Sequence, residues 1–87
     1  MKQEYTLDFD TAAGDALEGL PSEITHRIFK KIQGTKQDPH HFWSRMEGRT
    51  DYRIRVGDYR AIADIHDDKR LIYVTKIGHR KTVYESI

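Results

Sequence analysis

Arginines placed around a tight turn are the residues of this chain best suited to phosphate chemistry. Arg53 and Arg55 precede the pair Gly57-Asp58, and Arg60 follows it. A two-residue hairpin turn at this pair places Arg55 directly opposite Arg60. Arg53 then lies two residues back on the same face. Like charges directly opposite each other destabilise a sheet, whereas guanidinium groups bind phosphate oxygens through paired hydrogen bonds. The spacing therefore predicts a sheet face that binds an anionic partner.

The basic charge is concentrated in the same part of the chain. Residues 1–48 carry 6 Lys and Arg against 8 Asp and Glu, whereas residues 49–87 carry 9 against 6. The 87 residues include no cysteine, which excludes disulfides and thiolate zinc sites. The sequence has neither an apolar run of the roughly 20 residues that cross a membrane nor a signal-peptide pattern near its start. We therefore expect a cytoplasmic protein without a cofactor.

The apolar periodicity predicts one α+β domain over residues 1–87. The predicted elements are a strand over 2–8, a helix over 11–20, a second helix over about 21–37, and strands over about 51–56, 59–66 and 70–77. Asp10 suits the N-cap of the first helix. Pro21 suits the first turn of the second helix, whose end begins at Gly34 and which Asp38-Pro39 terminates. The order β-α-α-β-β-β predicts a small, mainly antiparallel sheet with a helical hairpin packed on one face. The other face stays open.

The connector between the helices and the last three strands is rich in aromatic residues. Phe42, Trp43 and Met46 are expected to cover the edge of the core, with Trp43 as a lid rather than a surface for base stacking. The neighbouring side chains of His40 and His41 diverge, and no third ligand has a useful spacing. No metal site is therefore predicted.

Together these features resemble the RelE/ParE toxins of type II toxin–antitoxin systems, and more narrowly the RelE branch. The resemblance covers essentially the whole chain and rests on the element order, the segment YRIRVGDYR (52–60) and the ending IGHRKTVY (77–84). RelE toxins are ribosome-dependent endoribonucleases that cut translated mRNA in the ribosomal A site, and a cognate antitoxin blocks them. The resemblance implies a metal-independent mRNA endoribonuclease whose partners are an antitoxin and the ribosome with its mRNA.

The resemblance also implies a set of site residues. They are Arg53, Arg55, Arg60, His79, Arg80 and Tyr84. The first two would hold RNA on the ribosome, and the other four would be catalytic, with Arg60 and Arg80 as phosphate ligands. Some relatives carry lysine at the first two positions and use one of these lysines as the base. Arginine is a poor proton acceptor at neutral pH, which makes His79 the candidate base.

Each site residue also has a purely structural interpretation. Arg60 and Arg80 could form surface ion pairs, His79 could hydrogen-bond a loop, and Tyr84 could pack at the sheet edge. Two further functions stay open for the whole chain. One is a ParE-like poison of DNA gyrase that cuts no RNA, and the other is a catalytically decayed module that only binds its antitoxin.

Overall fold

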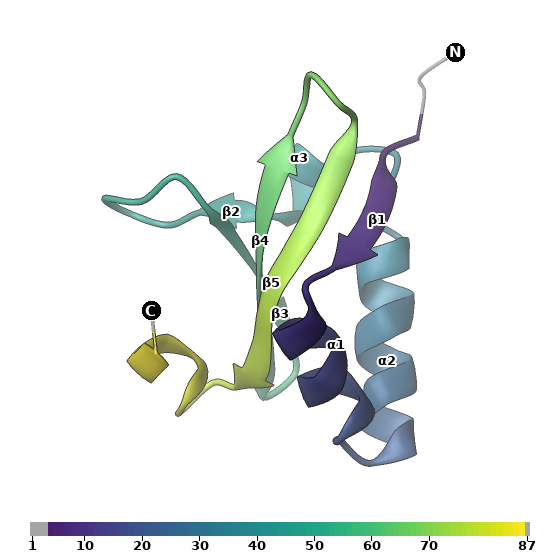
Figure 1. Cartoon of the computed structure of the whole chain (residues 1–87), viewed down its shortest axis with the longest axis vertical. Coiled ribbons are helices and arrows are strands. Elements are labelled where there is room, and N and C mark those ends of the chain that lie inside the picture. The colour runs from purple at the N-terminus through teal and green to yellow at the C-terminus, as the bar shows by residue number, and fades with distance from the viewer. Residues whose placement is uncertain (1–3, 87) are drawn as a thin grey trace.

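The computed structural model describes residues 4–86, and its elements run along the chain as shown in Figure 1. They are β1 (Thr6–Phe9), α1 (Thr11–Glu18), α2 (Ser22–Gln33), α3 (Pro39–Phe42), β2 (Ser44–Arg45), β3 (Tyr52–Val56), β4 (Tyr59–His66), β5 (Leu71–His79) and a single turn of 3-10 helix, η1 (Val83–Ser86). The predicted α+β class and the predicted order of the main elements are confirmed, with short α3 and β2 added inside the connector.

The five strands form one sheet in the order β1-β5-β4-β3-β2. Every neighbouring pair is antiparallel except β1 and β5, which run parallel. The predicted hairpin register is confirmed: Val56 pairs with Tyr59, and Arg55 lies opposite Arg60. Gly57 turns the chain with φ of 59°, a left-handed conformation that a side chain would strain. The local sequence at the turn therefore fixes which arginines face each other.

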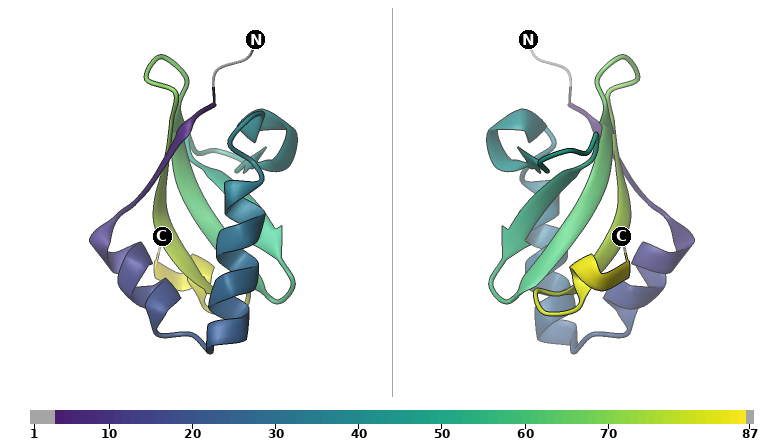
Figure 2. Two further views of the ribbon diagram at one scale, coloured as in Figure 1. Left: turned by 90° about the vertical axis from the view of Figure 1, so that its right-hand side faces the viewer. Right: turned by 90° about the vertical axis from the view of Figure 1, so that its left-hand side faces the viewer.

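Helices α1 and α2 form an antiparallel pair against one face of the sheet (Figure 2). Asp10 caps α1 as predicted, because its side chain accepts a hydrogen bond from the Ala12 backbone N–H. The apolar sides of both helices meet the apolar side of the sheet in the main core. Its most buried members are Ala13, Ile28, Ile32, Ala61, Ala63, Ile72 and Val74. This layer leaves the opposite face of the sheet free of long helices.

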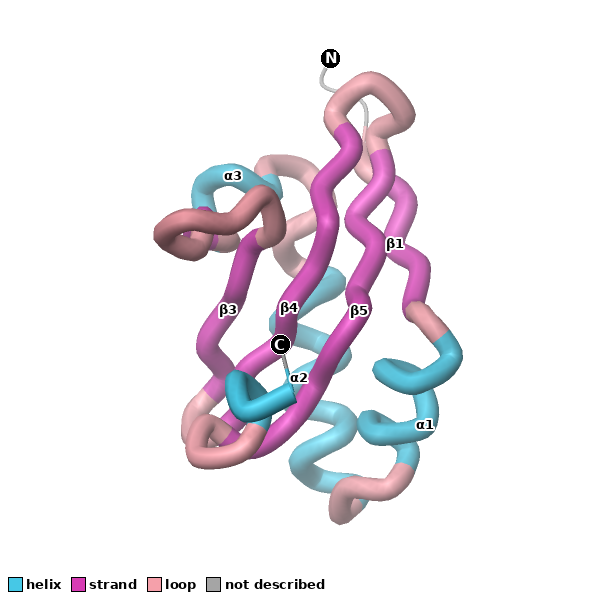
Figure 3. The backbone as a smooth tube through the Cα atoms, turned by 60° about the vertical axis from the view of Figure 1, so that its left-hand side comes forward, coloured by secondary structure: helices cyan, strands magenta, loops and turns pink. Residues whose placement is uncertain are grey.

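The opposite face carries a smaller apolar cluster at its centre. Met46, Ile62 and Val83 are buried there, and Tyr84 packs against them. Figure 3 shows η1 lying across this face, on the side away from α1 and α2. The Thr75 hydroxyl donates to the Ile62 carbonyl at 3.2 Å, beside the point where the β4–β5 register shifts. Such irregularities bend and twist a strand locally.

Both long helices end earlier than predicted. α1 ends at Glu18, and beyond it the Thr25 hydroxyl donates to the carbonyls of Leu17 and Leu20. α2 ends at Gln33 with Gly34 as its C-cap, as predicted for Gly34. The segment from there to Asp38 forms turns instead of helix, because the backbone N–H groups of Thr35 and Lys36 bond the carbonyls of Ile32 and Gln33. Pro39 instead begins α3. The first strand begins at Thr6, and residues 2 and 3 of the predicted strand lie outside the described residues.

The connector covers the core as predicted with Trp43 and Met46, which are buried, but not with Phe42. The Phe42 side chain is 41% exposed, so its assignment to the core edge is wrong. Phe29 is likewise 39% exposed, and its ring stacks on Phe9 with centroids 6.1 Å apart. Among the described residues, no helix is long and apolar enough to cross a membrane.

Candidate nucleic-acid interface

A groove of about 750 Å³ runs along the open face at the β3 edge of the sheet. Its lining comes from the β3–β4 hairpin, from the segment after β5, and from α2, α3 and β2. The lining residues are Lys31, His41, Phe42, Ser44, Arg53, Ile54, Arg55, Arg60, Arg80, Lys81 and Tyr84. Six of them are Lys or Arg, and within this described lining none is Asp or Glu. The groove therefore concentrates positive charge at a concave surface, which attracts anions.

The β3–β4 hairpin places three arginines on this groove. Arg53 and Arg55 are exposed on β3, and neither side chain pairs with another described side chain. Arg60 is half-buried, and its Nη1 donates to the carbonyls of Gly57 and Tyr59, both at 2.9 Å. These two hydrogen bonds from Nη1 to carbonyl oxygens hold the guanidinium in place, and they leave its other N–H groups for a ligand.

Arg80 reaches the groove from the turn after β5. Its backbone N–H donates to the Asp58 carbonyl at 2.8 Å, which ties this turn to the hairpin turn. Its side-chain Nε lies 3.8 Å from Oδ1 of Asp58, and the Arg80 and Asp58 side chains are 52% and 68% exposed. Exposed pairs at such distances are weak. Arg80 therefore forms a surface ion pair, as its structural interpretation expected, but a more strongly binding anion can displace Asp58 from it.

Tyr84 has the packing role that its structural interpretation expected, and its place at the groove leaves the functional interpretation a prediction. Its half-buried ring packs against Met46, Ile62 and Val83, and it also lines the groove. The residue thus joins the apolar centre of the open face to the basic groove, where the ring can contact a ligand without moving.

His79 lies apart from the groove lining. It pairs across the sheet with Tyr59, whose ring packs against the main core on the helical side. The two rings meet edge to face with centroids 5.5 Å apart. Nδ1 of His79 accepts a hydrogen bond from the Lys81 backbone N–H at 3.2 Å. The structure thus brings together Arg53, Arg55, Arg60, Arg80 and Tyr84. It places His79 on the other side of β5, where it shapes the turn that carries Arg80.

Sequence reasoning missed one wall of the groove. Lys31, His41, Phe42, Ser44 and Lys81 also line it. One available signal was the adjacency of two aromatic residues in a short helical segment, because neighbours there cannot both point into one core. The contact between α2, α3 and β3 is non-local and has no comparable signal in the sequence.

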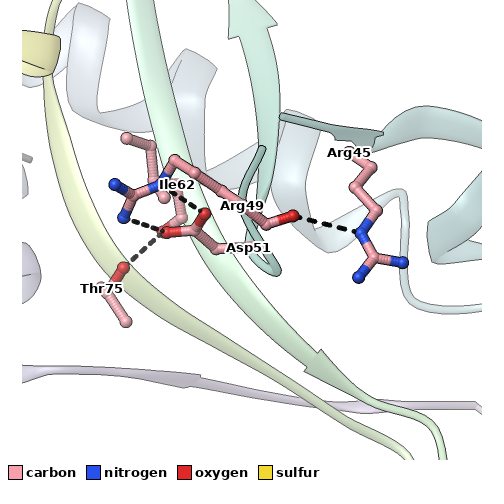
Figure 4. A network of polar contacts seen from close by, with 5 residues as sticks. All are labelled: Arg45, Arg49, Asp51, Ile62 and Thr75. Atoms are coloured by element: carbon pink, nitrogen blue, oxygen red, sulfur yellow. Dashed lines mark hydrogen bonds and ion pairs between the residues drawn. The ribbon is translucent and has the colours of Figure 1, made fainter. Parts of the chain in front are cut away.

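Two arginines outside the groove, Arg45 and Arg49, are engaged by hydrogen bonds within the chain. Figure 4 shows Arg45 donating to the Arg49 carbonyl, and Arg49 binding the Asp51 carboxylate with two nitrogens at 2.8 and 2.9 Å. The hydrogen bonds from Arg49 hold the pKa of Asp51 below its usual range. The Arg49–Asp51 ion pair contrasts with Arg53 and Arg55 on β3, whose side chains pair with no other described side chain. Among the described residues, no group of three or more potential ligands is placed to hold a metal ion.

The family model described as "ParE toxin of type II toxin-antitoxin system, parDE" matches residues 7–84. The chain therefore belongs to this family of toxins, within the RelE/ParE superfamily, as its two C-terminal motifs indicated. The chain is also 26% identical over 80 residues to the mRNA interferase toxin RelE of Escherichia coli K12, a match that covers 88% of this chain and 84% of that protein.

Solved structures show the same likeness to RelE toxins. The RelBE2 toxin–antitoxin complex of Mycobacterium tuberculosis matches with a TM-score of 0.78 and 25% identity, over 88% of this chain and 92% of that chain. The intact RelBE complex of E. coli matches with a TM-score of 0.76 and 25% identity, over 86% and 95% of the two chains. The fold and the toxin class are thus those expected from the resemblance.

Proposed function

We propose that this toxin is a metal-independent endoribonuclease that cuts mRNA in the A site of translating ribosomes and so stops translation. The proposal treats residues 1–87 as one toxin domain acting in the cytoplasm. Its main support is the groove, which combines six basic side chains with no acidic one among its described lining residues. The name of the E. coli relative, an mRNA interferase, supports the same activity.

The chemistry assigns a role to each groove residue. Cleavage requires the 2′-hydroxyl to attack the adjacent phosphorus, while charge builds on the phosphate and the 5′-oxygen departs. Arg60 and Arg80 stabilise that charge, because preorganised donors act mainly on the transition state. Arg53 and Arg55 hold the neighbouring backbone phosphates. Tyr84 contacts the RNA beside them.

Two histidines, His79 and His41, are the candidate proton acceptors. His79 is the predicted base, yet its ring lies outside the groove lining. His41 is the one histidine among the described residues that line the groove. With so few acid–base groups, most of the rate must come from positioning and electrostatics. This is the reason to expect dependence on the ribosome, which would hold the mRNA in place.

A cognate antitoxin is the proposed protein partner. The solved relatives include toxin–antitoxin complexes, and the unneutralised groove suits a partner with acidic side chains. Such a partner would bury apolar surface near Tyr84, beside the groove, and its charges would speed association and set the register. Co-expression with the neighbouring gene and affinity purification tests this part. Failure to recover a complex, together with harmless expression of the toxin alone, would contradict it.

Primer extension tests the activity itself. Translated mRNA is expected to be cut when the toxin is present, and the same naked message is expected to stay intact. Equal cleavage of the translated and the naked mRNA would contradict the proposed dependence on the ribosome. The Arg60→Ala variant is the matched control for contaminating nuclease.

Gyrase poisoning is the second candidate function, because the matched family is described by the parDE system. Induction of the toxin distinguishes the two, with pulse labelling of protein and DNA synthesis in the same culture. An early stop in translation supports the endoribonuclease. An early stop in replication with intact mRNA supports gyrase poisoning. No effect on translation or replication supports a catalytically decayed module that only binds its antitoxin.

A further inference from the structure

Phe42 is a large apolar side chain at a basic surface. Its ring is 41% exposed and lines the groove together with Arg53 and Arg55. The Nζ of Lys31 lies 5.8 Å from the ring centroid, and the His41 ring meets it edge to face with centroids 4.8 Å apart. The exposed ring is therefore embedded among positive and polar groups rather than in an apolar patch.

The backbone around Phe42 is anchored on both sides. Pro39 is buried and begins α3, and its carbonyl accepts the Trp43 backbone N–H at 2.8 Å. The Trp43 side chain is 3% exposed, and its Nε1–H donates to the buried Thr35 hydroxyl at 3.0 Å. Because Trp43 occupies the core, the side chain before it points outwards. Phe42 is thus held at the groove by its neighbours and not by burial of its own ring.

An anchored aromatic ring beside a basic groove matches the requirements of single-stranded nucleic acid. Such sites combine positive charge along the backbone with rings on which bases stack. A helical protein partner would instead need a continuous apolar stripe. The groove interrupts any such stripe with Lys31, Arg53, Arg55 and Arg60. The mixture of one exposed ring and several cations favours RNA over an apolar protein surface.

We propose that Phe42 is a stacking site for an unpaired RNA base, next to phosphates held by Arg53 and Arg55. This inference rests on the proposed function and extends it, because it adds a subsite on α3 that lies across the groove from Arg80 and Tyr84. Stacking does not depend on base identity. The subsite therefore contributes affinity and register of the bound strand, and it takes no part in the bond-breaking step.

The test compares two fluorescent single-stranded oligonucleotides of equal length, one of oligoadenylate and one with a ribose backbone lacking all bases. Phe42→Ala is expected to weaken binding of the first by roughly 5- to 100-fold, the range for loss of one stacked base. Binding of the abasic strand is expected to stay unchanged. Phe42→Trp should retain the affinity for oligoadenylate. Phe29→Ala is the matched control, because Phe29 is similarly exposed but lies outside the groove lining.

Each other outcome overturns the stacking site. Equal affinity of wild type and Phe42→Ala for oligoadenylate removes it, as does a failure of the wild type to bind this strand. An equal loss on the abasic strand would mean that Phe42 acts through Lys31. Unchanged RNA binding with impaired antitoxin binding would assign the ring to a protein partner. Ribosomal cleavage is measured separately, so stacking without cleavage rejects only the proposed function, and cleavage without stacking rejects only this subsite.

Discussion

Replacing Arg60 by alanine should abolish most of the cleavage while leaving the fold nearly intact. The substitution removes two hydrogen bonds to carbonyls at 2.9 Å, each contributing about 0.5–1.5 kcal/mol at most. It also removes the repulsion between Arg60 and Arg55, which lie opposite each other in the hairpin. Loss of this repulsion should raise the free energy of unfolding by about 0.2–1 kcal/mol. The net loss in the free energy of unfolding is therefore about 3 kcal/mol at most, which is less than the roughly 5–15 kcal/mol that such domains have in total.

The effect on catalysis should be far larger. Loss of one preorganised donor to a transition-state charge costs about 2.7–4 kcal/mol, or roughly 100- to 1000-fold in rate. Arg60→Lys keeps the charge but not the anchored planar fork, and it should fall between alanine and wild type. Arg27→Ala is the control, because it removes an exposed arginine on α2 outside the groove lining.

The assay is single-turnover cleavage on ribosomes programmed with one mRNA, together with thermal unfolding of each variant. A fall in the melting temperature of more than about 24 °C would show that this upper bound on the stability loss is wrong, given about 4–8 °C per kcal/mol in a domain of this size. Wild-type cleavage by Arg60→Ala would refute the reasoning, because the groove would then not bind the reacting phosphate.

Three further predictions concern proton transfer, pH and the groove wall. In single-turnover cleavage, replacing the true base by alanine should lower the rate by roughly 100- to 10000-fold; we expect this for His41→Ala or His79→Ala but not both, and two unchanged rates would exclude both imidazoles. Asp67 has a pKa below its usual range, first because the Tyr5 hydroxyl donates to it and then because of its contact with His40, so its contribution to stability is present above about pH 4 and is lost as the pH falls through the folded-state pKa. Urea unfolding from pH 2 to 7 should show Asp67→Asn less stable than wild type only at the upper end, and a constant difference would contradict this. Tyr84→Phe should unfold like wild type and should cleave more slowly if the hydroxyl contacts RNA. Equal cleavage rates for the variant and the wild type would mean that only the ring of Tyr84 contributes.

The hairpin was predictable because its causes are local. A Gly-Asp pair between alternating segments fixes the turn, and the turn fixes the register that sets Arg55 against Arg60. The N-cap at Asp10 is local in the same way. These features depend on a few consecutive residues, which a sequence displays directly.

The far wall of the groove was not predictable because its causes are tertiary. Trp43 enters the core through a hydrogen bond to Thr35, and only that contact decides that Phe42 faces outwards. The side of β5 on which His79 lies depends in turn on the register shift opposite Ile62 and Ala63. Neither contact can be inferred from residue spacing, because each is decided by how separate elements pack together and not by the residues of one element.

The parallel pairing of β1 with β5 has a consequence for how this chain is made. β1 can pair in the sheet only after β5 has been synthesised. The Tyr73 hydroxyl likewise donates a hydrogen bond to Asp10, which lies 63 residues earlier in the chain. Such non-local pairing slows folding. Arg80 and Tyr84 come later still along the chain. A chain under synthesis therefore cannot complete its sheet before β5 has left the ribosome, and the groove is finished only after Arg80, Lys81 and Tyr84 have followed it.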